Sequence, residues 1–196
     1  MDRIQSFIET KDYKSLVGAC ERIELQYAAE ATNHWDIVEI YTLLLLGYVL
    51  VDDLNSARYL RKRILAANRR TDQIDAAWRI CTALLERQFS KFYQTLDEYQ
   101  WSNLAVPLVV DIRETIQKRL LALIRKAYTS IHKTDAAQYF GMSEADVVPA
   151  LMGEGWEYNG ETGILIAPKS TPVQRERGDL NQFSRLADVL LQLENH

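Results

Sequence analysis

Apolar residues recur at steps of three and four positions through the first two-thirds of the chain, the spacing typical of amphipathic helices. The predicted helices span residues 12–30, 35–51, 54–67, 72–85 and 90–99. Residues 37–51 are apolar nearly all round, so neighbouring helices must cover most of that segment. The links between the segments are short and polar, which makes successive helices antiparallel neighbours. Residues 1–106 are therefore expected to form a stack of helical hairpins, a degenerate tetratricopeptide-like array without a fixed repeat.

A longer helix is expected to follow, entered at Pro107 because proline is tolerated in a first helical turn. It should end near Tyr128, where β-branched residues begin to favour a short strand. The predicted buried face of this helix consists of Val109, Ile112, Ile116, Leu120, Leu123 and Ala127. Two aspartates, Asp53 and Asp72, are expected to cap earlier helices.

The pattern then changes to short elements. A strand near Thr129, a helix capped by Thr134, and Gly141 in a left-handed turn are expected before a second helix capped by Ser143. Pro149 should kink or end that second helix. Asn159-Gly160, between two β-prone runs, predicts a hairpin. Strand, helix, turn, helix and hairpin is the order of a winged helix, so residues 107–167 are expected to form one together with the long helix. The fold class is mainly α with a small sheet.

Residues 168–178 are polar and charged, with two prolines, and are expected to form a linker. Residues 179–196 should form a last helix with an apolar seam at 3-4-3 spacing, made by Phe183, Leu186, Leu190 and Leu193. A helix of this length is marginal alone in water, so the seam needs a partner. Helices of other chains and the chain's own domain are both open as that partner.

Composition sets the broad class. The chain has 196 residues, 47% of them hydrophobic and 26% charged, with a formal net charge of −4. These values fit one soluble domain, or two small ones sharing a core. Cys20 and Cys81 are too few for a disulfide framework and are expected to be buried thiols, which suits a cytoplasmic and nuclear protein. A secretory signal is not expected, because the N-terminal residues lack a charged region followed by an apolar core. A membrane span is not expected either, because the most apolar stretch, residues 37–51, is too short to cross a bilayer.

The three histidines, His34, His132 and His196, are far apart and lack partners at metal-ligand spacing. Glycine-rich phosphate loops and a nucleophile elbow are also missing from the sequence. We therefore expect a protein that is not an enzyme and has no metal and no cofactor.

The winged helix raises the question of DNA binding, and charge argues against it. Residues 141–167 contain five acidic residues and no lysine or arginine, although phosphate contacts depend on cations. A winged-helix DNA-binding regulator is therefore the less favoured reading. The open edge of the small sheet is expected to pair with another protein. Ile164 and Ile166, on the last strand, are the candidate interface residues.

A basic cluster lies in residues 58–70, with no acidic residue from Leu54 to Thr71. On an ideal helix, its members Arg58, Arg61, Lys62 and Arg69 fall within about 100° of arc, opposite Leu60 and Ile64. Docking to an acidic protein surface and an ordinary solvated face are both open interpretations.

Several ordered segments resemble a known family. These are DLNSARYLRKRI from Asp53, AYTSIHKTDAAQYFGM from Ala127, Gly155-Trp156 and RLADVLLQLENH from Arg185. Together with the layout of helical hairpins, long helix, winged helix and terminal helix, they resemble the PCI-domain proteins, and within them most closely the signalosome branch.

The resemblance implies a function. PCI-domain proteins are shared by the signalosome, the proteasome lid and translation initiation factor three. The signalosome removes a ubiquitin-like modifier from cullins and so regulates cullin–RING ubiquitin ligases. The implied role is a non-catalytic scaffold that contacts other PCI subunits and their C-terminal helices in a hetero-oligomeric complex. A small subunit of the proteasome lid or of the initiation factor is the alternative. Contacts with nucleic acid or membrane are not implied.

Overall fold

The computed structural model describes residues 2–30 and 37–168. The predicted linker beyond Pro168 and the C-terminal seam lie outside these residues. The first six helices are α1 (Asp2–Glu9), α2 (Tyr13–Glu30), α3 (Ile37–Val51), α4 (Leu54–Ala66), α5 (Asp72–Leu85) and α6 (Phe89–Glu98). The remaining elements are α7 (Ala105–Ala127), β1 (Ser130–His132), α8 (Lys133–Phe140), α9 (Glu144–Gly153), β2 (Glu157–Asn159) and β3 (Ile164–Ile166). The mainly helical fold with a small sheet is confirmed.

Helix α3 is the centre of the helical part. It packs against α2, α4, α5 and α7, and every residue from Ile40 to Leu50 is buried. This burial on all sides is what the nearly continuous apolar run of α3 requires. None of the described helices is both long and apolar enough to span a membrane.

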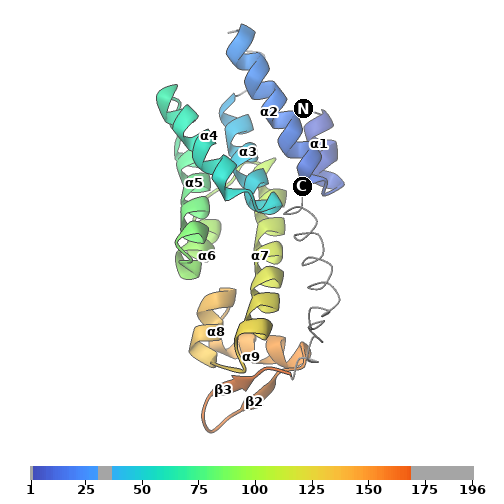
Figure 1. Ribbon diagram of the computed structural model, residues 1–196, viewed down its shortest axis with the longest axis vertical. Helices are drawn as coiled ribbons and strands as arrows, with labels where there is room; N and C mark the ends of the chain where they lie inside the picture. The colour runs from blue at the N-terminus through green and yellow to red at the C-terminus, as the bar shows by residue number, and fades with distance from the viewer. Residues whose placement is uncertain (1, 31–36, 169–196) are drawn as a thin grey trace, which may run out of the picture.

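The long helix α7 connects the helical stack to the winged helix at the opposite end of the molecule (Figure 1). It begins at Ala105, so Pro107 is its third residue and still lies in the first turn, where a missing N–H costs nothing. Ser102 holds this start in place. Its hydroxyl donates to Glu39 of α3, and Gln73 of α5 donates to the same carboxylate at 3.2 Å. Three elements distant in sequence therefore meet at the entrance of α7.

A second polar contact joins α7 to the N-terminal helices. Asp111, which is buried on α7, accepts hydrogen bonds from Lys11 Nζ and Tyr13 Oη, each at 2.6 Å. Both donors lie where α1 turns into α2. The carboxylate raises the pKa of Lys11, while burial, followed by the bond to Asp111, raises the pKa of Tyr13. The contact therefore ties the first hairpin to the long helix.

The caps agree with the sequence at two helices and differ at two others. Asp53 accepts from the Ser56 amide, and Ser143 accepts from the Asp146 amide, as expected. At α5 the cap is Thr71 and not Asp72, which is the first helical residue. Either side chain can accept an amide hydrogen bond, so sequence alone places such a cap only to within a residue or so.

At α8 the cap is not Thr134. The ring nitrogen Nδ1 of His132 accepts from the Thr134 amide, and the helix begins at Lys133. Pro149 does not end the second helix, because α9 continues through it to Gly153; the alternative expectation, a kink at Pro149, stays a prediction. Gly141 takes the expected left-handed conformation, with φ of 61°, between α8 and α9. These features confirm the helix-turn-helix core.

The winged helix is held to the helical stack by α6 and α7. The hydroxyl of Tyr93 on α6 donates to the Tyr139 carbonyl at 3.1 Å, and Gln117 Nε2 of α7 donates to the Phe140 carbonyl at 2.8 Å. One hydrophobic core runs without interruption from Ile4 of α1 to Leu165 of β3. The two parts therefore share their interior.

Candidate interaction surfaces

Among the residues that the structure describes, the sheet has two open edges, and neither belongs to the strand singled out from the sequence. Its order is β1-β3-β2, all antiparallel, so β3 is the central strand among the described residues. Ile164 and Ile166 lie on β3, so their backbone groups are already used for pairing. Ile166 remains 44% exposed, because it flanks buried Leu165 on the opposite face. These two residues can contact a partner only through their side chains.

The hydrogen-bond pattern shows which backbone groups are free at those edges. The Lys133 amide donates to the Gly163 carbonyl, and the Ala167 amide donates to the Thr129 carbonyl, both at 2.9 Å. Odd-numbered residues of β3 therefore face β1, and its even-numbered residues face β2. It follows that Tyr158 directs its N–H and C=O outward from β2. Ser130 does the same from β1.

The basic cluster does not form the single surface that an ideal helix predicts. Helix α4 ends at Ala66, and Asn68 has a positive φ of 52°, so Arg69 is no longer on the helix. The Arg69 guanidinium lies 4.7 Å from the Tyr27 ring centroid. The Arg61 side chain is only 11% exposed and pairs with Asp75 at 2.7 Å. The chain direction and these neighbours therefore remove two of the four cations from the open face.

What remains on the outer face of α4 is Arg58 and Lys62, both exposed. The Lys62 ammonium lies 5.7 Å from the ring centroid of Tyr59, which is 62% exposed. Leu60 and Ile64 are buried on the opposite side, as predicted. A docking role for this smaller patch stays a prediction.

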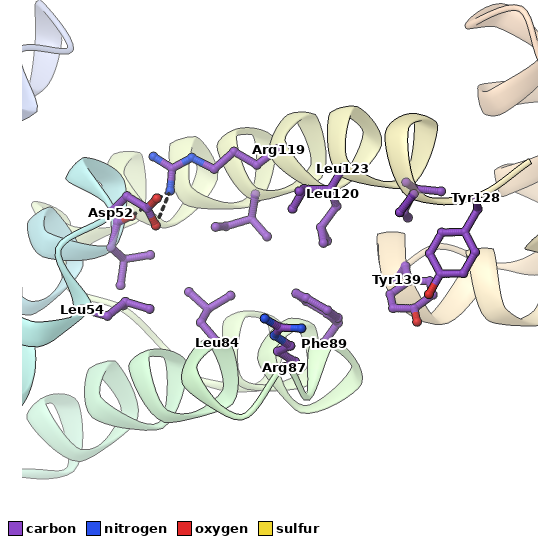
Figure 2. A pocket seen from close by; sticks show the side chains of 14 residues that line it. Asp52, Leu54, Leu84, Arg87, Phe89, Arg119, Leu120, Leu123, Tyr128 and Tyr139 are labelled. Atoms are coloured by element: carbon purple, nitrogen blue, oxygen red, sulfur yellow. Dashed lines mark hydrogen bonds and ion pairs between the residues drawn. The ribbon is translucent and has the colours of Figure 1, made fainter. Parts of the chain in front are cut away.

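A mainly apolar groove lies between α7 and the α5–α6 corner and encloses about 500 Å³ (Figure 2). Leu120 and Leu123 point into it from α7, toward Leu84 and Phe89 on the other wall. Tyr128 and Tyr139 close one end. The neighbouring Tyr128 hydroxyl is the main cause that raises the pKa of the Tyr139 phenol. We refer to this feature as the α7 groove.

A polar bridge closes the other end of the α7 groove. Arg119 Nη1 lies 3.1 Å from Asp52 Oδ1, and Arg119 Nη2 donates to the Leu50 carbonyl at 2.8 Å. The guanidinium therefore caps the C-terminal end of α3 and fixes the adjoining turn. Arg87 lies on the opposite wall.

The sequence missed the α7 groove because it placed Leu123 and Ala127 on the buried face of α7. Leu123 instead lines the open α7 groove and is 61% exposed, whereas the next residue, Ile124, is buried. Apolar residues at both 123 and 124 give α7 a stripe wider than its buried face, and this width was the available signal.

The described residues show no cluster suited to metal binding, that is, no three histidine, cysteine, aspartate or glutamate side chains placed to share an ion. Cys20 and Cys81 are buried, as predicted, and burial raises the pKa of each thiol to about 12. In the winged helix, Glu144 pairs with Lys133 at 3.0 Å. Glu157 and Glu161 have no ion-pair partner among the described residues.

Comparison with protein families now identifies the chain. The model of the CSN8/PSMD8/EIF3K family matches residues 37–176, which is more than half of the chain. The chain belongs to this family. The match begins at α3 and covers all described elements from there onward, including α7 and the winged helix.

Individual relatives in the CSN8/PSMD8/EIF3K family extend the similarity over nearly the full length. "COP9 signalosome complex subunit 8" of Danio rerio is 32% identical over 184 residues, covering 89% of this chain and 94% of that protein. The Xenopus laevis protein of the same name is 31% identical over 186 residues, 93% of each chain. The Arabidopsis thaliana protein of that name is 28% identical over 193 residues, 98% of each chain.

Proposed function

We propose that this chain is an assembly subunit of a signalosome, the complex that removes a ubiquitin-like modifier from cullins and regulates cullin–RING ubiquitin ligases. The observation that carries the proposal is the similarity, over about nine-tenths or more of both chains, to relatives named COP9 signalosome complex subunit 8. The family also includes PSMD8 and EIF3K, whereas these individual relatives come from the signalosome branch. The complex would act in the cytoplasm and the nucleus.

The proposed role is structural and not catalytic. The polar groups that the fold brings together support this view, because each described cluster joins elements of the scaffold. Glu39, Ser102 and Gln73 fix the entrance of α7, and Asp111 fixes the first hairpin. Both thiols lie in the core and not in a cleft.

Two contacts would hold the subunit in its complex. The first is pairing of a sister PCI subunit with an open edge of the sheet, where Tyr158 and Ser130 direct outward N–H and C=O groups that no described strand pairs with. The second is the C-terminal seam of Phe183, Leu186, Leu190 and Leu193, which would enter a helical bundle formed with other subunits. Protein and not nucleic acid is the proposed ligand, because residues 141–167 carry no lysine or arginine.

Co-purification tests the assembly role. A tagged chain lacking residues 179–196 should keep its melting temperature within a few degrees of the full-length chain but recover much less of the other subunits. Replacing Leu186 and Leu190 with charged residues should likewise leave the melting temperature nearly unchanged and lower the recovery of the other subunits. Undiminished recovery would contradict the bundle role, and a large loss of melting temperature would show that the seam packs on its own domain.

A second pair of variants tests the sheet edge. Tyr158→Pro removes an N–H that points away from β3, so the pairing of β2 with β3 is retained. A carbonyl group of a docking strand would lose the N–H that donates to it. Tyr158→Ala is the matched control, because it removes the side chain and keeps the N–H. The proposal expects weaker subunit recovery for Tyr158→Pro than for Tyr158→Ala. Equal recovery would place the interface elsewhere.

A further inference from the structure

The α7 groove has the dimensions and lining of a binding site for one helix. Its apolar floor on α7 runs from Ile116 to Ala127, about 17 Å at 1.5 Å per residue. This length matches about three helical turns. Leu123 is 61% exposed and Tyr128 is 47% exposed, so large apolar side chains face solvent there. Grooves of this kind bind the apolar stripe of an amphipathic helix.

The charges around the α7 groove define the kind of helix that fits. The Arg87 guanidinium has no ion-pair or hydrogen-bond partner among the residues that the structure describes. Lys126 follows Arg119 by seven residues, or nearly two full turns, and so lies along the same edge of α7. Lys126 also has no described side-chain partner. The one acidic residue in the lining, Asp52, is already paired with Arg119. Cations without partners therefore flank both sides of an apolar floor.

We propose that the α7 groove binds an amphipathic helix of another polypeptide, with apolar residues on one stripe and acidic residues beside it. Apolar contacts with Leu120, Leu123 and Leu84 supply affinity. Arg87 and Lys126 select acidic flanks, because complementary charge at a rim sets orientation and partner choice. This inference rests on the proposed role as an assembly subunit, but it concerns a surface separate from the sheet edges and the C-terminal seam.

Photo-crosslinking in the purified complex tests the proposal. Leu123 is replaced by p-benzoylphenylalanine, which its exposure allows, and the crosslinked peptides are identified by mass spectrometry. Leu25, which is 70% exposed on α2, receives the same replacement as a control. The expected product joins position 123 to a segment of another subunit that has an apolar stripe and a net negative charge, and position 25 does not give it. Crosslinks only to residues 169–196, only to a second copy, or to no segment would overturn the proposal.

Charge reversal tests the selection of acidic flanks. Arg87→Glu should lower the crosslink yield at position 123 by up to about fivefold, the upper scale for one exposed ion pair. Arg22→Glu on α2 is the matched control and should leave the yield unchanged. Changing the nearest acidic residue of the crosslinked segment to arginine should restore the yield with Arg87→Glu. Equal yields for the two reversals would overturn the charge argument.

The same preparation separates the two proposals. If the chain enters the complex and position 123 gives no crosslink to a partner, the groove inference fails and the assembly role stands. If the chain does not enter the complex, both fail.

Discussion

Replacing Gly141 by alanine tests how the winged helix is joined to the helical stack. Gly141 lies between α8 and α9 with φ of 61°, a left-handed conformation that side chains disfavour. A Cβ added there would lie 2.3 Å from Cγ and 2.4 Å from Cδ2 of Tyr93. Tyr93 cannot simply rotate away, because its ring is 4% exposed and its hydroxyl donates to the Tyr139 carbonyl at 3.1 Å.

Two costs add for this substitution. The left-handed backbone costs alanine about 1–2 kcal/mol. Displacing a packed aromatic ring costs about 1–3 kcal/mol, the usual range for an overfilled core. Alanine regains about 0.4–1 kcal/mol by restricting the unfolded chain. The expected loss in the free energy of unfolding is therefore about 2–4 kcal/mol.

Urea unfolding followed by far-UV circular dichroism measures this loss. Gly155→Ala is the matched control, since Gly155 also has positive φ, 86°, but an added Cβ would meet no atom within 4 Å. Gly155→Ala should lose only the backbone cost less the same gain from the unfolded chain, a net loss of about 1 kcal/mol. In a Tyr93→Ala background, where the clashing ring is absent, Gly141→Ala should cost no more than Gly155→Ala does. Equal losses at the two glycines would refute the packing argument.

Three further predictions concern the polar ties and the thiols. Asp111→Ala should lower the free energy of unfolding by about 2 kcal/mol, because Lys11 and Tyr13 lose their shared acceptor; an unchanged urea midpoint would contradict the tie between the first hairpin and α7. Asp53→Ala should cost about 1 kcal/mol at pH 7. Hydrogen bonds from Ser56, in the first turn of α4, lower the pKa of Asp53. The stability that Asp53 contributes is therefore present above the carboxyl's unfolded pKa and is lost as pH falls through its folded pKa. A difference in unfolding free energy between Asp53→Ala and the parent that does not change over pH 2–6 would contradict this pH dependence. Cys81, whose pKa burial raises to about 12, should react with a thiol reagent at pH 8 only at the rate at which the fold opens; rapid labelling without denaturant would show that the core is accessible.

The sequence predicts much of this fold because local signals and burial agree. The run from Ile37 to Val51 has no polar face, so only a central helix can accommodate it, and α3 is central. A left-handed turn favours glycine, and Gly141 occupies that turn. A helix N-cap favours serine, and Ser143 caps α9. The hairpin around Asn159 has the expected β-prone flanks. In each case the residue type has a steric or hydrogen-bonding reason that does not depend on distant neighbours.

The interaction surfaces were predicted less well, because they depend on which elements become neighbours. Arg69 leaves the helical face only because Asn68 ends α4, and Arg61 is covered only because Asp75 of α5 lies beside it. Ile164 and Ile166 lie at the centre of the sheet because β1, from a distant segment, pairs with β3. Leu123 is exposed at the α7 groove although its neighbour Ile124 is buried. Periodicity gives the apolar stripe but not which part of it the neighbouring elements cover.

Membership of a signalosome can be measured by quantitative mass spectrometry of the proteins recovered with a tagged copy of the chain, expressed at its natural level. If the chain is an assembly subunit, a complete set of PCI subunits should be recovered in equal amounts, together with activity that removes the ubiquitin-like modifier from cullins. Recovery of the chain alone, or of equal amounts of proteasome-lid or initiation-factor subunits with it, would contradict membership of a signalosome.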